Sequence, residues 1–309
     1  MTKIPVMIDC DTGIDDAAAL ILAFASNELE ICGVTTVAGN VELSKTTPNT
    51  LKVLDLIGAQ VPVYVGADKP LFRELHTAAE VHGKDGLQGI ELPESKRTTE
   101  KEAAWDAIHR EAVRLGGKLQ LIAVGPLTNI AIALSKYNNL PQLIERIVIM
   151  GGAVGCGNTT PAAEFNIYVD PEAAEMVFRS GIPVYACGLD VTHKSTLNGA
   201  EIEKIRAVGT PVHRFFAEVC QHSLNHSLKF YGQDGAHLHD PCALMYALDS
   251  SYFTTKRCWV GVETKGTITR GRTVTDLYSD AKHEPNAWFV VDIEREKFVE
   301  RIMAMLNVD

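Results

Sequence analysis

Hydrophobic positions along this chain fall into short runs and longer segments that alternate. The short runs are rich in Val and Ile, as buried strands are. They occupy residues 4–9, 30–38, 61–66, 119–125, 146–152 and 183–188. The longer segments, rich in Ala and Leu, predict helices at 15–26, 47–58, 126–137 and 170–181. Strand, helix and strand in succession predict βαβ units and a parallel sheet.

The C-terminal part of the chain has a different pattern of hydrophobic positions. Residues 198–229 are mostly helical in pattern, and a helix is predicted at 294–306. Between them lie β-branched runs at 258–264, 273–277 and 287–293. No linker or repeat divides the chain, so we expect one α/β domain over residues 1–309. Its central, mostly parallel sheet should be flanked by helices.

Composition narrows the class of protein. A hydrophobic content of 46% is sufficient for a large core, and the net charge of −10 disfavours binding to nucleic acid or an anionic membrane. The sequence has neither a signal-peptide pattern nor an apolar stretch long enough to span a membrane. Seven scattered cysteines without a C-x-x-C pair indicate free thiols in a reducing compartment, which predicts a cytoplasmic location.

Four aspartates gather between the first strand and the first helix, namely Asp9, Asp11, Asp15 and Asp16. One structural explanation is that they cap the helix and oppose its dipole. Closely spaced carboxylates repel each other, however, and a cation relieves that repulsion. Oxygen ligands favour Ca²⁺ or Mg²⁺. In an open α/β sheet this loop would also lie at the ligand-binding edge.

Three known motifs share parts of this cluster and do not fit. An EF-hand loop requires Asp or Asn where Gly13 stands and Gly where Ile14 stands. Aspartic proteases contain D-T-G, as at 11–13, but they are all-β proteins, and here a helix follows at once. Haloacid-dehalogenase phosphatases resemble D-x-D-x-T/V, and position 13 is Gly instead.

Polar residues also follow later strands or begin loops and helices. Each has a simple structural explanation: Asp240 before a proline suits a helix N-cap, His239 beside it suits the surface, and Asn166 could satisfy loop backbone. Together with the aspartates they suggest a site instead. These candidates are Asn40, Asn158, Glu164, Asn166, His239 and Asp240.

Several stretches together resemble the inosine-uridine nucleoside hydrolases. They are "IDCDTGIDDAAALILA", "VGPLTNIAIAL", "IVIMGGAV", "AEFNIYVDPEAA", "LDVTHK" and "LHDPCA", in family order over nearly the whole chain. The resemblance implies a Rossmann-like nucleoside hydrolase fold. It also implies hydrolysis of ribonucleosides to free base and ribose, and assembly as a homo-oligomer, either a dimer or a tetramer.

The resemblance further implies one bound Ca²⁺. Its ligands would be the side chains of Asp11, Asp16 and Asp240 and a backbone carbonyl near Val124. Asp11 would also act as general base toward the attacking water, and His239 would protonate the leaving base.

By the same resemblance, Asp15, Asn40, Glu164 and Asn166 would bind ribose hydroxyls. Asn158 would lie near the 5′-hydroxyl.

Three further positions follow from the resemblance or depart from it. Met150 would lie against the sugar, and His82 would lie over the base. Residue 12 is Thr where many relatives have Pro, which should change the stiffness of the loop. Tyr231, in the region 222–234, could contact the base or could pack in the core.

The chemistry of these residue types agrees with glycosidic cleavage. The transition state is oxocarbenium-like, so carboxylate and amide oxygens around the sugar would stabilise its positive charge. A histidine titrates near neutral pH and suits the role of acid. A non-catalytic nucleoside- or ribose-binding protein with a metal site remains the alternative, although such a protein needs neither the base Asp11 nor the acid His239.

Overall fold

The computed structural model describes residues 3–277 and 282–308. Within them a nine-stranded sheet has the order β10-β9-β11-β6-β5-β4-β1-β2-β3. Its strands are β1 (Ile4–Cys10), β2 (Leu29–Thr36), β3 (Val63–Val65), β4 (Leu119–Ala123), β5 (Ile144–Met150), β6 (Val184–Cys187), β9 (Phe253–Val262), β10 (Thr273–Asp276) and β11 (Ala287–Ile293). Within this sheet, as far as its residues are described, only the pairings of β9 with β10 and β11 are antiparallel, which confirms the mostly parallel α/β sheet.

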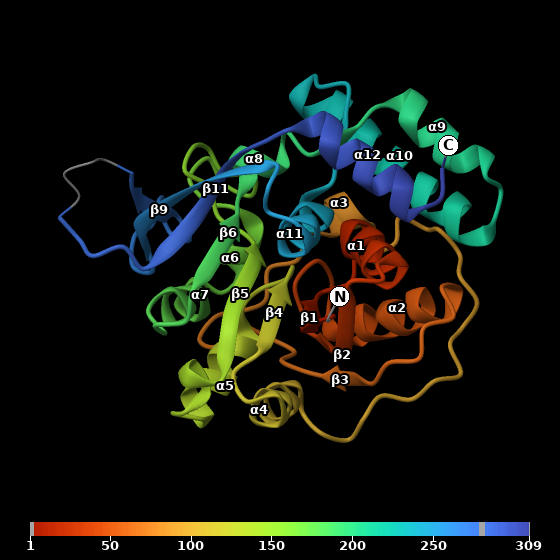
Figure 1. Ribbon diagram of the computed structural model, residues 1–309. Helices are drawn as coiled ribbons and strands as arrows, with labels where there is room; N and C mark the ends of the chain where they lie inside the picture. The colour runs from red at the N-terminus through yellow and green to blue at the C-terminus, as the bar shows by residue number, and fades with distance from the viewer. Residues whose placement is uncertain (1–2, 278–281, 309) are drawn as a thin grey trace.

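Helices cover both faces of this sheet, as Figure 1 shows. Alternate residues of β1 face opposite sides: Val6 and Ile8 pack into one core cluster, and Met7 packs into the other. The first cluster is covered by α1 (Ile14–Ala25), α2 (Leu43–Leu56), α9 (Gly199–Ala207), α10 (Pro211–Tyr231), α11 (His239–Leu248) and α12 (Arg295–Met305). The second is covered by α4 (Ala104–Leu115), α5 (Thr128–Lys136) and α7 (Pro171–Phe178).

Shorter elements occur along the chain between these strands and helices. They are α3 (Ala79–His82), the 3₁₀ turn Leu140–Gln142, α6 (Phe165–Val169), α8 (Leu189–Thr192) and the small antiparallel pair β7 (Thr196–Leu197) and β8 (Ala236–His237). Most of them carry residues of the site described below.

The predicted elements occur with shifted ends. The helix predicted at 170–181 begins within one residue of its predicted start, because Asp170 caps α7 by accepting a hydrogen bond from the Ala173 amide at 3.0 Å and Pro171 is the first helical residue. By contrast, α2 begins at Leu43, four residues before the predicted start at 47. Hydroxyls of Thr46 and Thr47 hold this extra turn against the end of β2, so tertiary contacts override the proline signal at position 48.

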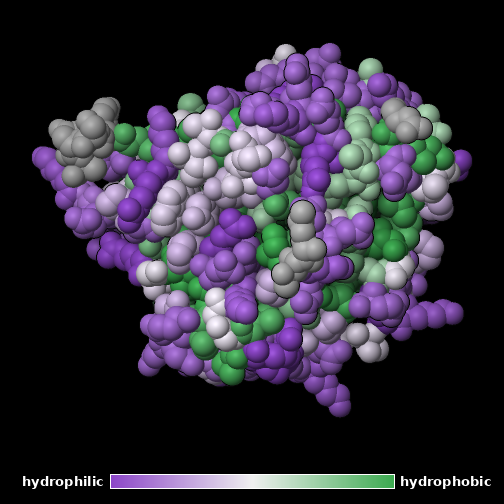
Figure 2. All heavy atoms as spheres, in the orientation of Figure 1, coloured by the Kyte–Doolittle hydropathy of each residue, from purple (hydrophilic) through white to green (hydrophobic). Residues whose placement is uncertain are grey.

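The face of the molecule in Figure 2 is mostly hydrophilic, with hydrophobic residues in scattered groups. Among the described residues, no helix combines the length and apolar character that a bilayer span requires.

Candidate active site

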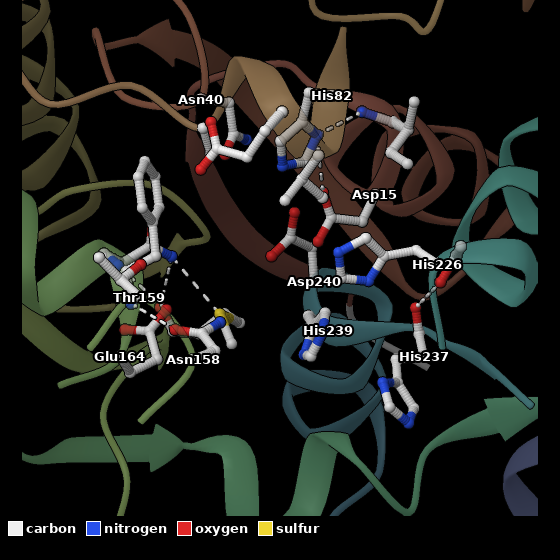
Figure 3. A pocket seen from close by; sticks show the side chains of 18 of the residues that line it. Asp15, Asn40, His82, Asn158, Thr159, Glu164, His226, His237, His239 and Asp240 are labelled. Carbon is white, nitrogen blue, oxygen red and sulfur yellow. Dashed lines mark hydrogen bonds and ion pairs between the residues drawn. The ribbon is translucent and has the colours of Figure 1, made fainter. Parts of the chain in front are cut away.

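A cavity of about 430 Å³ opens beside the carboxyl ends of the parallel strands. Figure 3 shows Asn158, Thr159 and Glu164 on one side of it and Asp15, Asp240 and His239 on the other. All the predicted site residues line this cavity except Asp11 and Asp16, which lie buried beneath it. Those that line it are Asp15, Asn40, His82, Val124, Met150, Asn158, Glu164, Asn166, His239 and Asp240.

Asp11 is completely buried in a slot between two glycines. A Cβ on Gly39 would come within 2.1 Å of Asp11 Oδ2, and one on Gly125 would come within 2.7 Å of Asp11 Oδ1. The Asn40 amide donates to Oδ2 at 2.7 Å, whereas Oδ1 has no hydrogen-bond partner in the part of the chain that the structure describes. A buried carboxylate oxygen without a donor is costly, so Oδ1 is placed to meet a ligand.

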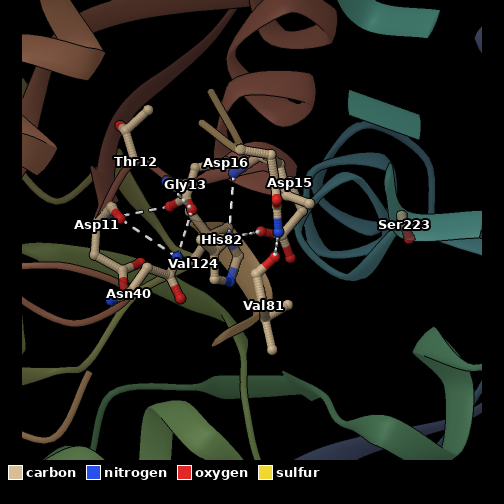
Figure 4. A network of polar contacts seen from close by, with 12 residues as sticks. Asp11, Thr12, Gly13, Asp15, Asp16, Asn40, Val81, His82, Val124 and Ser223 are labelled. Atoms are coloured by element: carbon tan, nitrogen blue, oxygen red, sulfur yellow. Dashed lines mark hydrogen bonds and ion pairs between the residues drawn. The ribbon is translucent and has the colours of Figure 1, made fainter. Parts of the chain in front are cut away.

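Asp16 closes the loop between β1 and α1, as Figure 4 shows. Its carboxylate accepts the amides of Asp11 at 3.0 Å and Gly13 at 2.9 Å. The Asn40 side chain donates to it at 2.9 Å. The capping explanation of the sequence therefore holds for Asp16, which satisfies free N–H groups at the start of α1. Capping does not explain its buried acidic neighbours.

Asp9 does not join the cluster, although it belongs to the same run of four aspartates. Strand alternation turns its side chain to the other face of the sheet, where it accepts hydrogen bonds from Thr35 and Asn129. The site is thus built on Asp11, Asp15 and Asp16.

Three carboxylates from two distant segments converge at the base of the cavity. Oxygens of Asp15, Asp16 and Asp240 lie within 4.8 Å of one another. Burial, reinforced by the charge of Asp15, raises the pKa of Asp16 to about 6 and that of Asp240 well above its usual range. Burial and the charge of Asp16 likewise raise the pKa of Asp11.

The carboxylate oxygens of this cluster are ligands that suit a hard cation. Asp15 Oδ1, like Asp11 Oδ1, is buried and has no hydrogen-bond partner within residues 3–277 and 282–308. No Lys or Arg is present among the described residues that line the cavity, so no side-chain cation balances the acids there.

The grouping differs in one respect from the expected ligand set: Asp15 makes the close triad with Asp16 and Asp240, and Asp11 lies next to Asp16 outside that triad.

Backbone carbonyls of two strand ends meet at Asn166. Its side-chain amide donates to the carbonyl of Val124 at 2.8 Å and to that of Met150 at 3.0 Å. A carbonyl oxygen has a second lone pair, so Val124 retains capacity for another partner. The expectation that Asn166 satisfies loop backbone is therefore also met.

Glu164 is held in one orientation by backbone amides. It is the N-cap of α6 and accepts from Gly152 at 3.0 Å, Asn166 at 3.0 Å and Ile167 at 3.2 Å. Burial raises its pKa to about 7, although these three N–H groups oppose the shift. Nearby, Asn158 Oδ1 accepts the amide of Phe165 at 3.0 Å, which leaves the amide nitrogen of Asn158 available to a ligand.

His82 ends the short helix α3 and is buried against the aspartate loop. Its Nδ1 accepts the Ile14 amide at 3.2 Å, so the proton of the neutral ring is on Nε2. The same Nδ1 lies 3.8 Å from Asp15 Oδ1. Burial lowers the pKa of His82 to about 4, and the ring is therefore neutral near pH 7.

His239 is the first residue of α11 and immediately precedes Asp240. Its Nδ1 and the Thr192 hydroxyl are 2.8 Å apart, which orients the ring at the cavity wall. The surface explanation for His239 is thus wrong, because the residue lines the cavity beside the acid cluster. Asp240 is buried within the first turn of α11 and is not its N-cap, which is Leu238.

The far wall of the cavity contains residues that the sequence did not assign. They come from α3, the segment before it and α10, and they include His76, Glu80, Ser223, His226, Ser227 and Phe230. Tyr231 lies with them and is 39% exposed, so it does not pack in the core. The polar residues in 222–234 were the available signal, but only the fold shows which helical face meets the cavity.

Comparison with known proteins identifies the family of this chain. The family model of inosine-uridine preferring nucleoside hydrolases matches residues 6–300. The pyrimidine-specific ribonucleoside hydrolase RihA of Salmonella arizonae is 47% identical over 306 residues, 98% of each chain.

Two solved structures have the same fold over 98% of both chains. A plant nucleoside hydrolase is 31% identical with a TM-score of 0.92, and a purine-preferring ribonucleoside hydrolase from Gardnerella vaginalis is 33% identical with a TM-score of 0.92. Together with the family match, these likenesses show that the chain belongs to the inosine-uridine preferring nucleoside hydrolase family and is a ribonucleoside hydrolase.

Proposed function

We propose that Asp11 and His239 catalyse the reaction, in which the N-glycosidic bond of a ribonucleoside breaks and water adds to the ribose carbon. Asp11 removes a proton from the attacking water, and His239 gives a proton to the leaving base. The burial of Asp11 and its unpartnered Oδ1 support its role, since that oxygen is free to accept a proton.

Sugar recognition falls to polar residues on both sides of the cavity. Asp15, Asn40, Glu164 and Asn166 bind the ribose hydroxyls, and Asn158 binds the 5′-hydroxyl. Glu164 and Asn166 are already oriented by hydrogen bonds to backbone groups, so binding costs little side-chain entropy. Their oxygens also favour the positive charge that develops on the sugar in the transition state.

Asp11, Asp16, Asp240 and the carbonyl of Val124 would hold a Ca²⁺ ion, with Asp15 close enough to join them. When bound, such a cation polarises the attacking water and orients the sugar. The residues themselves fix the position: Asp16 through the amides of Asp11 and Gly13, and Asp240 through its place on α11.

At the other end of the cavity, His239 and His82 border the space for the base, and Met150 lies against the sugar. The Thr192 hydroxyl holds His239 by Nδ1, so Nε2 is the nitrogen left to carry the transferred proton. His82 contributes an Nε2–H group to the base, because its Nδ1 already accepts a backbone amide.

We propose that uridine and cytidine are the preferred substrates. The 47% identical relative is named as pyrimidine-specific, whereas the structure named as purine-preferring is 33% identical. Near the base, Ser227 Oγ is buried without a hydrogen-bond partner and can meet a polar edge of the ring.

The observation that carries this proposal is the convergence of Asp15, Asp16 and Asp240 at the base of a cavity that His239 also lines. A kcat/KM panel for ribose release from uridine, cytidine, inosine, adenosine and guanosine tests it. We expect the two pyrimidine nucleosides to give the highest values. A purine nucleoside at the top would overturn the preference, and tight nucleoside binding without ribose release would indicate a binding protein.

The remaining expectations concern the whole chain. We propose that residues 1–309 act as one nucleoside hydrolase domain, supported by the continuous sheet. We also propose a cytoplasmic location, supported by cysteines that are all free, and a homo-oligomer, supported by the family resemblance. Light scattering after size-exclusion chromatography tests the last point, and a monomer would contradict it.

A further inference from the structure

Three histidines from separate segments form a cluster beside the acidic site. His193 follows α8, His237 lies in β8, and His239 begins α11. The His193 and His237 rings stack with centroids 4.6 Å apart, and the His239 ring lies 5.8 Å from the first and 5.6 Å from the second. One ring nitrogen from each lies within 4.8 Å of the others.

Each ring keeps a nitrogen that no protein group occupies. His237 Nε2 is 2.7 Å from the Gln233 carbonyl oxygen, which only accepts, so Nε2 carries the proton and Nδ1 has a bare lone pair. His239 Nδ1 is bonded to the Thr192 hydroxyl, which leaves Nε2. His193 Nε2 is buried and has no hydrogen-bond partner among the described residues. A buried nitrogen in this state is costly, which indicates that His193 Nε2 binds a ligand.

The charge state of the cluster suits a metal. Burial, together with the neighbouring histidines, lowers the pKa of His237 to about 4. Burial also lowers the pKa of His193. Both rings are therefore neutral near pH 7, which is the form that binds metals.

We propose that His193, His237 and His239 form a binding site for Zn²⁺ or a similar borderline divalent ion, separate from the carboxylate site, and that its occupation inhibits the enzyme. Imidazole nitrogens prefer Zn²⁺, Co²⁺, Ni²⁺ and Cu²⁺, whereas carboxylate oxygens prefer Ca²⁺. The bonds to Gln233 and Thr192 are of the kind that orients histidine ligands.

Coordination requires a local rearrangement. Nitrogens that share one Zn²⁺ at about 2.0–2.1 Å in a tetrahedral site lie about 3.3–3.4 Å apart. The His193 ring must therefore turn out of its stack on His237, while Gln233 and Thr192 hold the other two rings. Because His237 and His239 line the cavity, the fourth coordination position faces it and stays open.

Inhibition rests on the proposed role of His239, whereas the metal site itself does not. The lone pair that binds the ion is on Nε2, the nitrogen that must otherwise hold the transferred proton. A bound ion therefore removes the acid from the reaction. Substrates whose leaving group needs no proton, such as p-nitrophenyl riboside, should lose less activity than uridine.

Zn²⁺ affinity tests the site directly. Enzyme kept in excess Ca²⁺ is titrated with Zn²⁺ against a chromophoric zinc indicator, as wild type, His193→Asn and the control His222→Asn, whose histidine is on α10 outside the cluster. We expect one Zn²⁺ per chain, an affinity loss of about tenfold or more in His193→Asn, and wild-type affinity in His222→Asn. Equal affinity in all three proteins would overturn the proposal.

Co²⁺ provides a test that needs no variant. Bound through three imidazoles in a low-coordinate site, it should give intense visible d–d bands, and Zn²⁺ should abolish them. Weak bands typical of an all-oxygen octahedral site would refute the histidine site. If the bands appear and Zn²⁺ leaves uridine hydrolysis unchanged, the metal site stands and the acid role of His239 fails.

Discussion

At the scale of single residues, the proposed mechanism depends on Asp11 in its glycine slot. Asp11→Asn keeps the shape and the bond from the Asn40 amide but removes the proposed base, so kcat for uridine should fall by about 100-fold or more. The matched control is Asp106→Asn, which changes a carboxylate on the surface helix α4. Asp11→Asn activity within about tenfold of wild type would exclude Asp11 as the general base.

The role of His239 predicts a dependence on the leaving group. His239→Ala should reduce kcat for uridine by about 100-fold and leave p-nitrophenyl riboside within a few-fold of wild type, since that leaving group departs without a proton. Rates for both substrates with both proteins provide the measurement. Equal losses for the two substrates would show that His239 does not act as the acid.

The sequence alone identified the candidate residues whose chemical type is itself informative, namely acids and a histidine. The aspartates at 11, 15 and 16 and the pair His239–Asp240 stood out because charge is rare beside buried segments. It missed Ser227 and His193, because a serine or histidine on a helix or turn gives no sign of what it faces. Their significance comes from long-range contacts that only the fold creates.

At the scale of elements, the loop that carries Asn158 is held from two sides. Asp190 accepts the amides of Val154 at 2.7 Å and Gly155 at 3.0 Å. Arg272 donates to the carbonyls of the same two residues at 2.9 Å and 2.8 Å. These contacts should fix the position of Asn158 against the 5′-hydroxyl.

Arg272→Ala should therefore lower kcat/KM for uridine by about tenfold and have a much smaller effect with 5′-deoxyuridine. Arg257→Ala, which removes an exposed arginine over Trp288, is the control. A double variant with Asn158→Ala should lose little more than either single variant. Equal effects on both substrates would mean that the loop acts on stability in general.

Element types were predictable where periodicity was strong, and element ends were not. The pattern at 15–26 matches α1 within one residue. The stretch between β3 and β4 received no prediction, yet it contains α3 and α4. α3 spans only Ala79–His82, so its stability comes from contacts with the site rather than from its own sequence.

At the scale of the whole molecule, the cation should stabilise the fold in a pH-dependent way. Burial raises the pKa of Asp15 and of Asp16 from 3.8 to about 6. Well below pH 3.8 both are protonated in the folded and the unfolded chain, so they do not change its stability. Between about pH 4 and pH 6 they ionise in the unfolded chain while they stay protonated in the folded one, so cation-free protein loses stability over that range and stays less stable above it.

Added Ca²⁺ should relieve that loss. The increase in Tm on adding Ca²⁺ should be near zero at about pH 4 and reach several degrees at about pH 7. Thermal unfolding at a series of pH values, with chelator and with Ca²⁺, measures it. An increase that is constant across this range would show that the raised carboxylates are not the ligands.

The central claim is that carboxylates of the β1–α1 loop and of α11 converge on one hard cation that turnover requires. Ribose release from uridine by chelator-treated enzyme, followed while Ca²⁺ is added back, tests it most directly. We predict that activity is lost with the chelator and returns fully at one Ca²⁺ per chain. Full turnover by enzyme from which every cation has been removed would contradict the claim.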